Sequence, residues 1–345
     1  MFEQRDLKED PKWGKYLVAP SAFFKVIEQA KDLLTPLYPK VAEVLYAIKT
    51  GANEFFCLPN RFFTIREEGN YVVLLDKGTK KDRFWIEKEY VVPVLNKIKP
   101  HKSIGNVKRD GFLLWVTESK NELRKKGKKV LKYVEYGESR EHVWRNITYK
   151  GYNEHPTCSS RSPWYAIENR DKAPIFSPSI FWGRYLMFWN PKKFYGTDCL
   201  VEIHPRMKKH QKALCAILNS TLTALFIEFS GRYIENRDKT ISNEVKIYEL
   251  RKLPVLDPAA LEKKDPALLH KLEEAFDKLL DREVKPVFDE VDFADRKELD
   301  RIVFKDILGL SKDEMKEVWE STGQLYRDRI ERLSAATEQN DADEE

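Results

Sequence analysis

The chain has 345 residues, of which 42% are hydrophobic and 12% aromatic, with 14 glycines and 17 prolines. This composition is typical of a globular protein and excludes a disordered or fibrous chain. No apolar stretch reaches the roughly 18 to 20 residues that a membrane span requires, and charged residues follow Met1 where a signal peptide would be apolar. We therefore expect a cytoplasmic protein without a membrane partner.

The charge is distributed unevenly along the chain. Residues 1–256 carry 46 Lys and Arg against 30 Asp and Glu, a balance of +16, whereas residues 257–345 carry 15 against 26, a balance of −11. A basic body suits a polyanionic partner, most commonly a nucleic acid. The alternative is an ordinary lysine-rich surface.

The N-terminal residues 1–50 are predicted to form a helical connector. Apolar residues recur at helical spacing over 21–34, and Val41, Val44, Leu45 and Ile48 mark the buried face of a second helix. Gly51 follows where a left-handed C-terminal cap falls.

Residues 51–256 are predicted to form a basic, β-rich body. Short runs rich in aromatic and β-branched residues indicate strands, and the apolar periodicity of 208–229 indicates one long helix. The strand predictions cover 55–58, 62–65, 71–75, 111–116, 130–136, 164–167, 179–188 and 199–203.

Residues 257–345 are predicted to form an acidic helical tail. Asp265 before Pro266 favours a helix start, and Ser311 with Glu314 forms a capping box after Gly309. The polar segment from about Ser334 is expected to be disordered. The fold class that follows is α+β.

The cysteines and histidines give no metal or disulfide pattern. Cys57, Cys158, Cys199 and Cys215 lie far apart without a CxxC pair, and the six histidines form no HxH or HxxxH pair. We expect buried thiols and no metal site.

Five short motifs follow one another in a fixed order: KTGANEFF at 49–56, RSPWY at 161–165, AILNS at 216–220, LRKLP at 250–254 and RKELD at 296–300. This succession, from near Trp13 onward, resembles the C-terminal target-recognition (specificity) region of TaqI-like adenine-N6 DNA methyltransferases and of fused restriction-modification enzymes. The resemblance implies a unit that recognises a short sequence in double-stranded DNA and holds it against a methyltransferase catalytic domain.

Family members carry S-adenosylmethionine on that catalytic domain, beside an Asn-Pro-Pro-Tyr-type loop that grips the extruded adenine. The closest strings here are SPWY at 162–165 and NPKK at 190–193, which lack the double proline. We therefore expect no catalytic residue and no cofactor in this chain, with S-adenosylmethionine on a partner subunit or domain.

Clusters of cations are the predicted phosphate contacts. The longest is Arg124, Lys125, Lys126, Lys128 and Lys129 around one glycine, for which the alternative is a solvated hairpin tip. Smaller clusters are Lys80, Lys81 and Arg83, then Lys108 and Arg109, then Lys192 and Lys193.

Arg161 beside Trp164 and Tyr165 is a candidate for reading a base edge or a phosphate, because a guanidinium matches paired acceptors. Equally, the two aromatic residues can be core residues of a β element. Asn53 can position a phosphate, but it can also simply form a turn.

Two other functions remain open. A divergent Mg²⁺-dependent nuclease would use Glu244-Val245-Lys246 after Asp238, or Glu283-Val284-Lys285 after Asp281. A general nucleic-acid or RNA-binding protein would use the basic loops and the aromatic residues.

Overall fold

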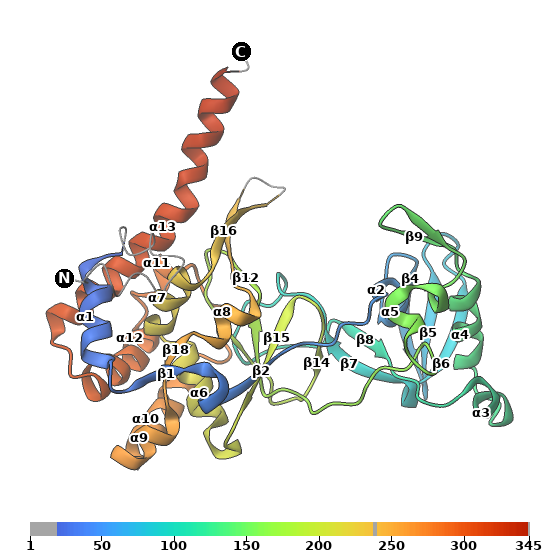
Figure 1. Cartoon of the computed structure of the whole chain (residues 1–345), viewed down its shortest axis with the longest axis horizontal. Helices are drawn as coiled ribbons and strands as arrows, with labels where there is room; N and C mark the ends of the chain where they lie inside the picture. Colours follow the sequence, from blue (N-terminus) through green and yellow to red (C-terminus); the bar gives the residue numbers. More distant parts are fainter. Residues whose placement is uncertain (1–18, 237–239, 344–345) are drawn as a thin grey trace.

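The computed structural model describes residues 19–236 and 240–343, and the side chains up to residue 331. The chain forms two lobes (Figure 1). The smaller lobe consists of residues 48–94 and 111–167, and the larger lobe contains the other described residues. Helices and several sheets are both present, which confirms the α+β class. Trp13 and Asp238 lie outside the described residues.

The larger lobe is built on three antiparallel sheets. The central sheet has the order β13-β11-β15-β2, and β2 pairs with β15 so that Val44 lies opposite Ile203. Its strands are β2 (Ala42–Tyr46), β11 (Ile175–Pro178), β13 (Phe188–Trp189) and β15 (Leu200–Pro205). The others are β1 (Leu34–Pro36) with β18 (Pro254–Leu256), and β12 (Ile180–Phe181) with β17 (Ile241–Glu244) and β16 (Arg232–Glu235).

Helices from both ends of the chain cover these sheets (Figure 1). They are α1 (Ser21–Ala30), α6 (Gln211–Leu218), α7 (Thr221–Ser230), α8 (Ile247–Arg251), α9 (Pro258–Lys264), α10 (Pro266–Asp277), α11 (Val287–Glu290), α12 (Ala294–Arg301) and α13 (Lys312–Asp343). Asp265 caps α10 by accepting a hydrogen bond from Ala267 N–H at 2.9 Å, and Ser311 with Glu314 forms the predicted capping box. α13 continues through the segment from Ser334 that was expected to be disordered.

The smaller lobe combines a β-meander, a second sheet and short helices. The meander is β4 (Phe63–Glu68), β5 (Tyr71–Asp76) and β6 (Asp82–Glu87). The second sheet is β14 (Tyr195–Gly196), β7 (Val91–Leu95), β8 (Gly111–Leu114) and β3 (Cys57–Leu58), and its β14 comes from the larger lobe's part of the chain. The helices are α2 (Asn53–Phe56), α3 (Lys120–Lys125), α4 (Val130–Ser139) and α5 (Pro156–Ser159), and a hairpin is formed by β9 (His142–Trp144) and β10 (Ile147–Tyr149).

Each lobe has its own hydrophobic core. One core joins residues from α1, the central sheet, α6, α7 and the acidic region up to Tyr326, and the other lies within the smaller lobe around Phe55 and Tyr133. The predicted divisions at residues 50 and 256 therefore do not coincide with the limits of the cores. The acidic region shares a core with residues that were placed in the basic body.

Two element predictions are wrong because the burial period was misjudged. The helix predicted over 41–48 is strand β2, in which Ala42 and Val44 alternate with less buried neighbours. The strand predicted over 130–136 is helix α4, because Val130, Tyr133 and Val134 share one buried helical face. The segment 164–167 is a turn, and of 179–188 only 180–181 and residue 188 belong to strands.

The long helix predicted over 208–229 is broken into α6 and α7. Asn219 ends α6, and its side chain bonds both the N–H and the C=O of Met187, while Ser220 caps α7 by accepting from Thr223 N–H. In the described ranges no single helix has the length and apolar character of a membrane span; α6 with the preceding turn and α7 have them only as a pair bent by 74°.

Candidate nucleic-acid interface

The predicted cations Lys80, Lys81 and Arg83 are all exposed at the turn between β5 and β6. Asp76 closes this turn, because its carboxylate accepts a hydrogen bond from Thr79 N–H at 2.8 Å. This hydrogen bond is the main reason that the pKa of Asp76 lies below its ordinary value. Asp76 is thus occupied in holding the turn, and the three cations extend into solvent.

The longest basic cluster runs from the end of α3 to the start of α4, so it is not a hairpin tip. Three of its cations are in ion pairs: Arg124 with Glu135 at 3.4 Å, Lys126 with Glu118 at 3.4 Å, and Lys128 with Glu89 at 2.5 Å. Lys129 lies 4.3 Å from the centroid of the Tyr71 ring. Lys125 is exposed and forms no ion pair within the described chain. Exposed ion pairs contribute little free energy to stability. The paired cations can therefore leave these carboxylates and bind phosphates instead.

The two smaller clusters both lie outside the residue ranges of the smaller lobe. Arg109 pairs with Glu67 and lies over the Phe112 ring, while Lys108 is exposed. Lys192 and Lys193 are exposed on the turn after β13. The side chain of Asn190 organises that turn, because its amide donates to the carbonyls of Ala173 and Phe194 at 2.7 and 2.9 Å.

Arg161 and Asn53 both contact the segment through which the chain enters the smaller lobe. The Arg161 guanidinium donates to the carbonyls of Thr50 and Lys49 at 2.8 and 3.2 Å, and Nη1 is buried without a partner. Asn53 accepts from the Thr50 hydroxyl and donates to Asp198 at 2.6 Å. Both side chains hold the 49–53 turn in place.

Trp164 and Tyr165 belong to the core of the smaller lobe, which was the alternative to a direct DNA contact. Tyr165 is 1% exposed, and its hydroxyl donates to the Glu118 carbonyl at 2.8 Å. Trp164 packs against Phe55 and donates to Glu138 at 3.0 Å. Tyr165 therefore presents no free face to a base, and Trp164 is half-buried and packed on Phe55.

The strings 162–165 and 190–193 do not fit a methyl donor or an extruded adenine. Trp164 is held against Phe55, and the Asn190 amide is used up by the backbone of its own turn. Methyl transfer needs a side-chain acceptor and a stacking ring that are both available to the base. In both strings these groups are engaged within the fold.

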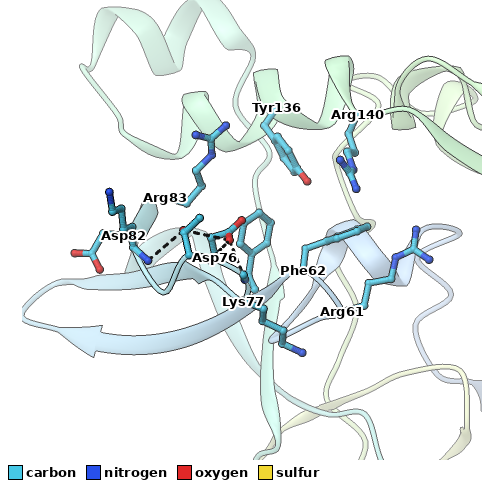
Figure 2. A pocket seen from close by; sticks show the side chains of 12 residues that line it. Arg61, Phe62, Asp76, Lys77, Asp82, Arg83, Tyr136 and Arg140 are labelled. Carbon is cyan, nitrogen blue, oxygen red and sulfur yellow. Dashed lines mark hydrogen bonds between the residues drawn. The ribbon is translucent and has the colours of Figure 1, made fainter.

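A cavity of about 590 Å³ opens between the start of β4, the β5–β6 turn and the end of α4 (Figure 2). Its lining includes the predicted Lys81 and Arg83, and also residues that the sequence did not single out: Arg61, Phe62, Lys77, Tyr136 and Arg140. These come from separate segments, so no local spacing marks them as a group.

The β9–β10 hairpin is a second feature missed in the sequence. Its two-residue turn places Arg145 and Asn146 at φ of 50° and 64°, the pair of positive angles that a type I′ hairpin turn uses. Val143 and Ile147 beside the turn are 67% and 54% exposed. The alternation of apolar and polar residues around an Asn was the available signal.

The Glu-x-Lys triplets lie in ion pairs. Glu244 pairs with Arg232 and Lys246, and Glu283 pairs with Lys102 and Lys285. In the described part of the chain, no three His, Cys, Asp or Glu side chains are grouped so as to hold a metal ion.

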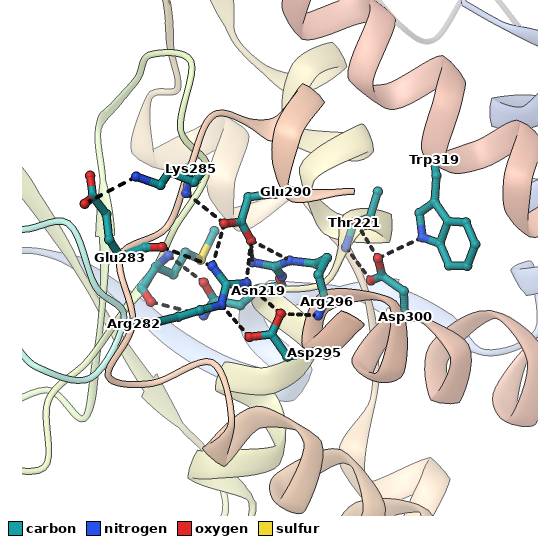
Figure 3. Close-up of polar contacts among 11 residues, drawn as sticks. Asn219, Thr221, Arg282, Glu283, Lys285, Glu290, Asp295, Arg296, Asp300 and Trp319 are labelled. Atoms are coloured by element: carbon teal, nitrogen blue, oxygen red, sulfur yellow. Dashed lines mark hydrogen bonds and ion pairs between the residues drawn. The ribbon is translucent and has the colours of Figure 1, made fainter. Parts of the chain in front are cut away.

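A buried polar network stabilises the acidic region of the larger lobe (Figure 3). Arg282 donates to Glu290 at 2.6 Å and also pairs with Asp295, and Arg296 lies 3.3 Å from Glu290. Burial alone would raise the pKa of Glu290, but the hydrogen bonds from Arg282 and the charge of Arg296 hold it below its ordinary value. The network is structural.

Two known proteins resemble this chain, one over half of its length and the other over most of it. The type II methyltransferase M.AccI of Acinetobacter calcoaceticus is 26% identical over 175 residues, which are 50% of this chain and 26% of that protein. The crystal structure of the type IIG restriction endonuclease BpuSI matches 92% of this chain and 34% of its own, with a TM-score of 0.57 and 12% identity. At that identity the second match shows a shared fold alone. The chain spans between a quarter and about a third of these proteins.

The family described as "Type II methyltransferase M.Eco57I, C-terminal domain" matches residues 10–234, which is more than half of the chain. The order of motifs, the α+β fold and this match agree. The chain belongs to the family of the C-terminal domain of the type II methyltransferase M.Eco57I, a family of restriction-modification enzymes.

Proposed function

We propose that this chain recognises the target sequence of a DNA adenine-N6 methyltransferase, reading duplex DNA while a partner domain carries out the chemistry. The observation that carries the proposal is the exposed β9–β10 hairpin of the smaller lobe. The hairpin extends away from the body of that lobe (Figure 1). A two-stranded ribbon of this kind fits the major groove of B-DNA, which is about 12 Å wide.

The turn of the hairpin offers the side chains that distinguish base pairs. Arg145 can donate two hydrogen bonds to a guanine edge, and Asn146 can bond an adenine edge in the same paired manner. Val143 and Ile147, both exposed, can contact a thymine methyl group. The inner end is anchored, because the His142 ring stacks on Tyr152 with centroids 4.3 Å apart.

The cationic loops supply affinity that is independent of sequence. Lys80, Lys81, Lys125 and Lys192 are exposed and have no carboxylate partner in the described ranges. Each contact with a phosphate releases counterions, which favours binding without distinguishing bases.

The proposed partner is a catalytic domain that holds S-adenosylmethionine and the extruded adenine. The matched part of this chain covers only 26% and 34% of the two relatives, which supports a further domain in the working enzyme. The engaged state of Trp164 and Asn190 also supports placing methyl transfer elsewhere.

Recognition is tested by selecting duplexes from a random pool with the full chain and measuring affinity for the selected site. Arg145→Ala and Asn146→Ala should each reduce discrimination by about 1 to 3 kcal/mol and leave affinity for random duplex unchanged. Arg301→Ala, on the larger lobe, is the matched control. The absence of any selected sequence, or tighter binding of single-stranded RNA than of duplex DNA, would contradict the proposal.

The division of labour is tested by calorimetry and by methyl incorporation. The chain alone should show no saturable binding of S-adenosylmethionine and should methylate no DNA. Adding a catalytic domain from the same family should yield N6-methyladenine at the selected site. Methylation by the rigorously purified chain alone would refute this part.

A further inference from the structure

The cavity of the smaller lobe is lined by cations from three segments (Figure 2). Arg61 precedes β4, Lys77, Lys81 and Arg83 lie around the β5–β6 turn, and Arg140 ends α4. The volume of about 590 Å³ is within the range of small-ligand sites. The acidic side chains of the lining are Asp76 and Asp82.

Both carboxylates are already engaged. Asp76 accepts hydrogen bonds from Gly78 N–H at 3.0 Å and Thr79 N–H at 2.8 Å, and Asp82 pairs with Arg66 at 3.0 Å. Neither carboxylate forms an ion pair with a cation of the cavity.

The cations are largely unneutralised. Arg61 pairs with Glu54 at 3.0 Å. Across the described ranges, Lys77, Lys81, Arg83 and Arg140 have no ion pair, and Nε of Arg140 is buried without a hydrogen-bond partner. A concentration of positive charge around a half-enclosed space, with a buried donor left open, favours an anion.

The aromatic residues of the cavity favour a phosphate over a base. The guanidinium carbons of Arg61 and Arg140 lie 4.5 and 4.3 Å from the centroid of the Phe62 ring. A stacked base would have to displace these two cations. The Tyr136 hydroxyl, whose pKa burial raises, stays protonated and can donate to a phosphate oxygen.

The cavity is joined directly to the hairpin. Arg140 is the C-terminal cap of α4, and β9 begins two residues later at His142. An anion held by Arg140 would therefore fix the base of the hairpin relative to that anion. Backbone contacts set the register of a protein on DNA in this way.

We propose that this cavity binds one phosphodiester of the DNA backbone and thereby sets the register in which the β9–β10 hairpin meets the bases. The inference rests on the proposed function. Arg140 and Arg83 are the principal donors, and the Phe62 ring keeps the Arg140 guanidinium in place.

The test couples a protein variant to a chemical change in the DNA. Single uncharged methylphosphonates are placed in turn along the selected duplex, and affinity is measured for the wild-type chain and for Arg140→Gln. One methylphosphonate position should weaken wild-type binding roughly tenfold, as expected for a lost charge-assisted contact. At that position Arg140→Gln should lose nothing further, and its log–log salt slope should be flatter by about 0.9.

Two further variants complete the design. Arg83→Gln, at an exposed position, should show the same coupling, so the test survives if Arg140→Gln proves unstable. Lys271→Gln removes one exposed charge from α10. The losses of affinity caused by this variant and by a methylphosphonate should add at every position of the duplex.

The outcomes separate the two proposals. Additive losses at every position, with wild-type binding intact, would overturn the phosphate site and leave sequence recognition standing. Failure of the wild-type chain to bind duplex DNA would overturn both. Inorganic phosphate that binds the wild-type chain but not Arg140→Gln, without DNA binding, would assign the cavity to a free phosphate and overturn the DNA assignment.

Discussion

Arg161 holds the segment through which the chain enters the smaller lobe. Its guanidinium binds the carbonyls of Lys49 and Thr50 at 3.2 and 2.8 Å, where the chain enters the smaller lobe. Both hydrogen bonds come from Nη2, which the planar guanidinium holds between the two carbonyls, whereas the ammonium of a lysine sits on a flexible stem. The residue that most resembled a base reader in the sequence thus fixes the turn from which the lobe begins.

Arg161→Ala should lower the free energy of unfolding by about 1 to 3 kcal/mol, because it removes charged hydrogen bonds to two carbonyls. Arg161→Lys should recover only part of this loss. Urea unfolding of the full chain measures the effect, with Arg145→Ala as an exposed control. If stability is unchanged and only affinity for the selected DNA falls, Arg161 contacts DNA directly.

Glu290 and Asp295 should make the larger lobe sensitive to acid. Burial raises the pKa of each carboxyl, but the hydrogen bonds and charges of Arg282 and Arg296 together offset this, so both folded pKa values lie below the ordinary 4.5 and 3.8. Groups with lowered pKa values stabilise the fold above their unfolded pKa, and this stability is lost as pH falls through the folded pKa. Urea unfolding between pH 6 and about 3 should show the loss.

Glu290→Gln should weaken that pH dependence, whereas Glu274→Gln, at an exposed position on α10, should leave it unchanged. An identical acid profile in wild type and Glu290→Gln would exclude the network as its source.

Among the helices and strands, the sequence predicts those whose formation depends on residues close together along the chain. The caps of α10 and α13 and most strands of the meander were predicted, because Asp265, Ser311 and short β-branched runs act through near neighbours. α4 was missed because aromatic and β-branched residues suggested a strand, although their spacing is helical. The break at Asn219 depends on Met187, which only the folded chain brings near.

The sequence could reveal only those candidate interface residues that lie close together along the chain. The cationic loops were visible as sequence runs, whereas the cavity joins Arg61, Arg83 and Arg140 from separate elements. Only the fold shows that Tyr165 is buried and that Trp164 packs against Phe55.

The α3–α4 loop should contribute unequally to DNA affinity. Among the described residues, Lys125 and Lys129 form no ion pair with a carboxylate, whereas Lys126 and Lys128 are paired. Replacing Lys125 and Lys129 by Gln should flatten the log–log salt slope by about 2, since each phosphate contact contributes roughly 0.9. The paired change at Lys126 and Lys128 should have a smaller effect. A slope unaffected by either change would remove the loop from the interface.

At the scale of the whole molecule, the acidic region is part of the larger lobe and not an appendage. Leu272, Phe304 and Tyr326 share one core with Phe23 and Val44 from the beginning of the chain. The negative charge of residues 257–345 is therefore carried by the platform from which the basic smaller lobe extends.

Truncation after Asp257 should unfold the larger lobe, because it removes one side of that core and exposes large apolar side chains. Circular dichroism and hydrogen exchange should show loss of protection in α6 and α7. A truncated chain that unfolds cooperatively and binds the selected DNA normally would show that the acidic region is dispensable.

The chain passes between the two cores repeatedly: between Ala47 and Ile48, between Val94 and Leu95, between Val107 and Phe112, and between Ile167 and Ala173. Hydrogen bonds such as that from the Asn53 amide to Asp198, at 2.6 Å, add to these connections. Several covalent crossings restrain the smaller lobe in ways that one linker cannot. The lobe is therefore preorganised, and the proposed binding of DNA would lose little conformational entropy between the lobes. Under that proposal, more of the contact energy would remain for distinguishing the correct sequence from its neighbours.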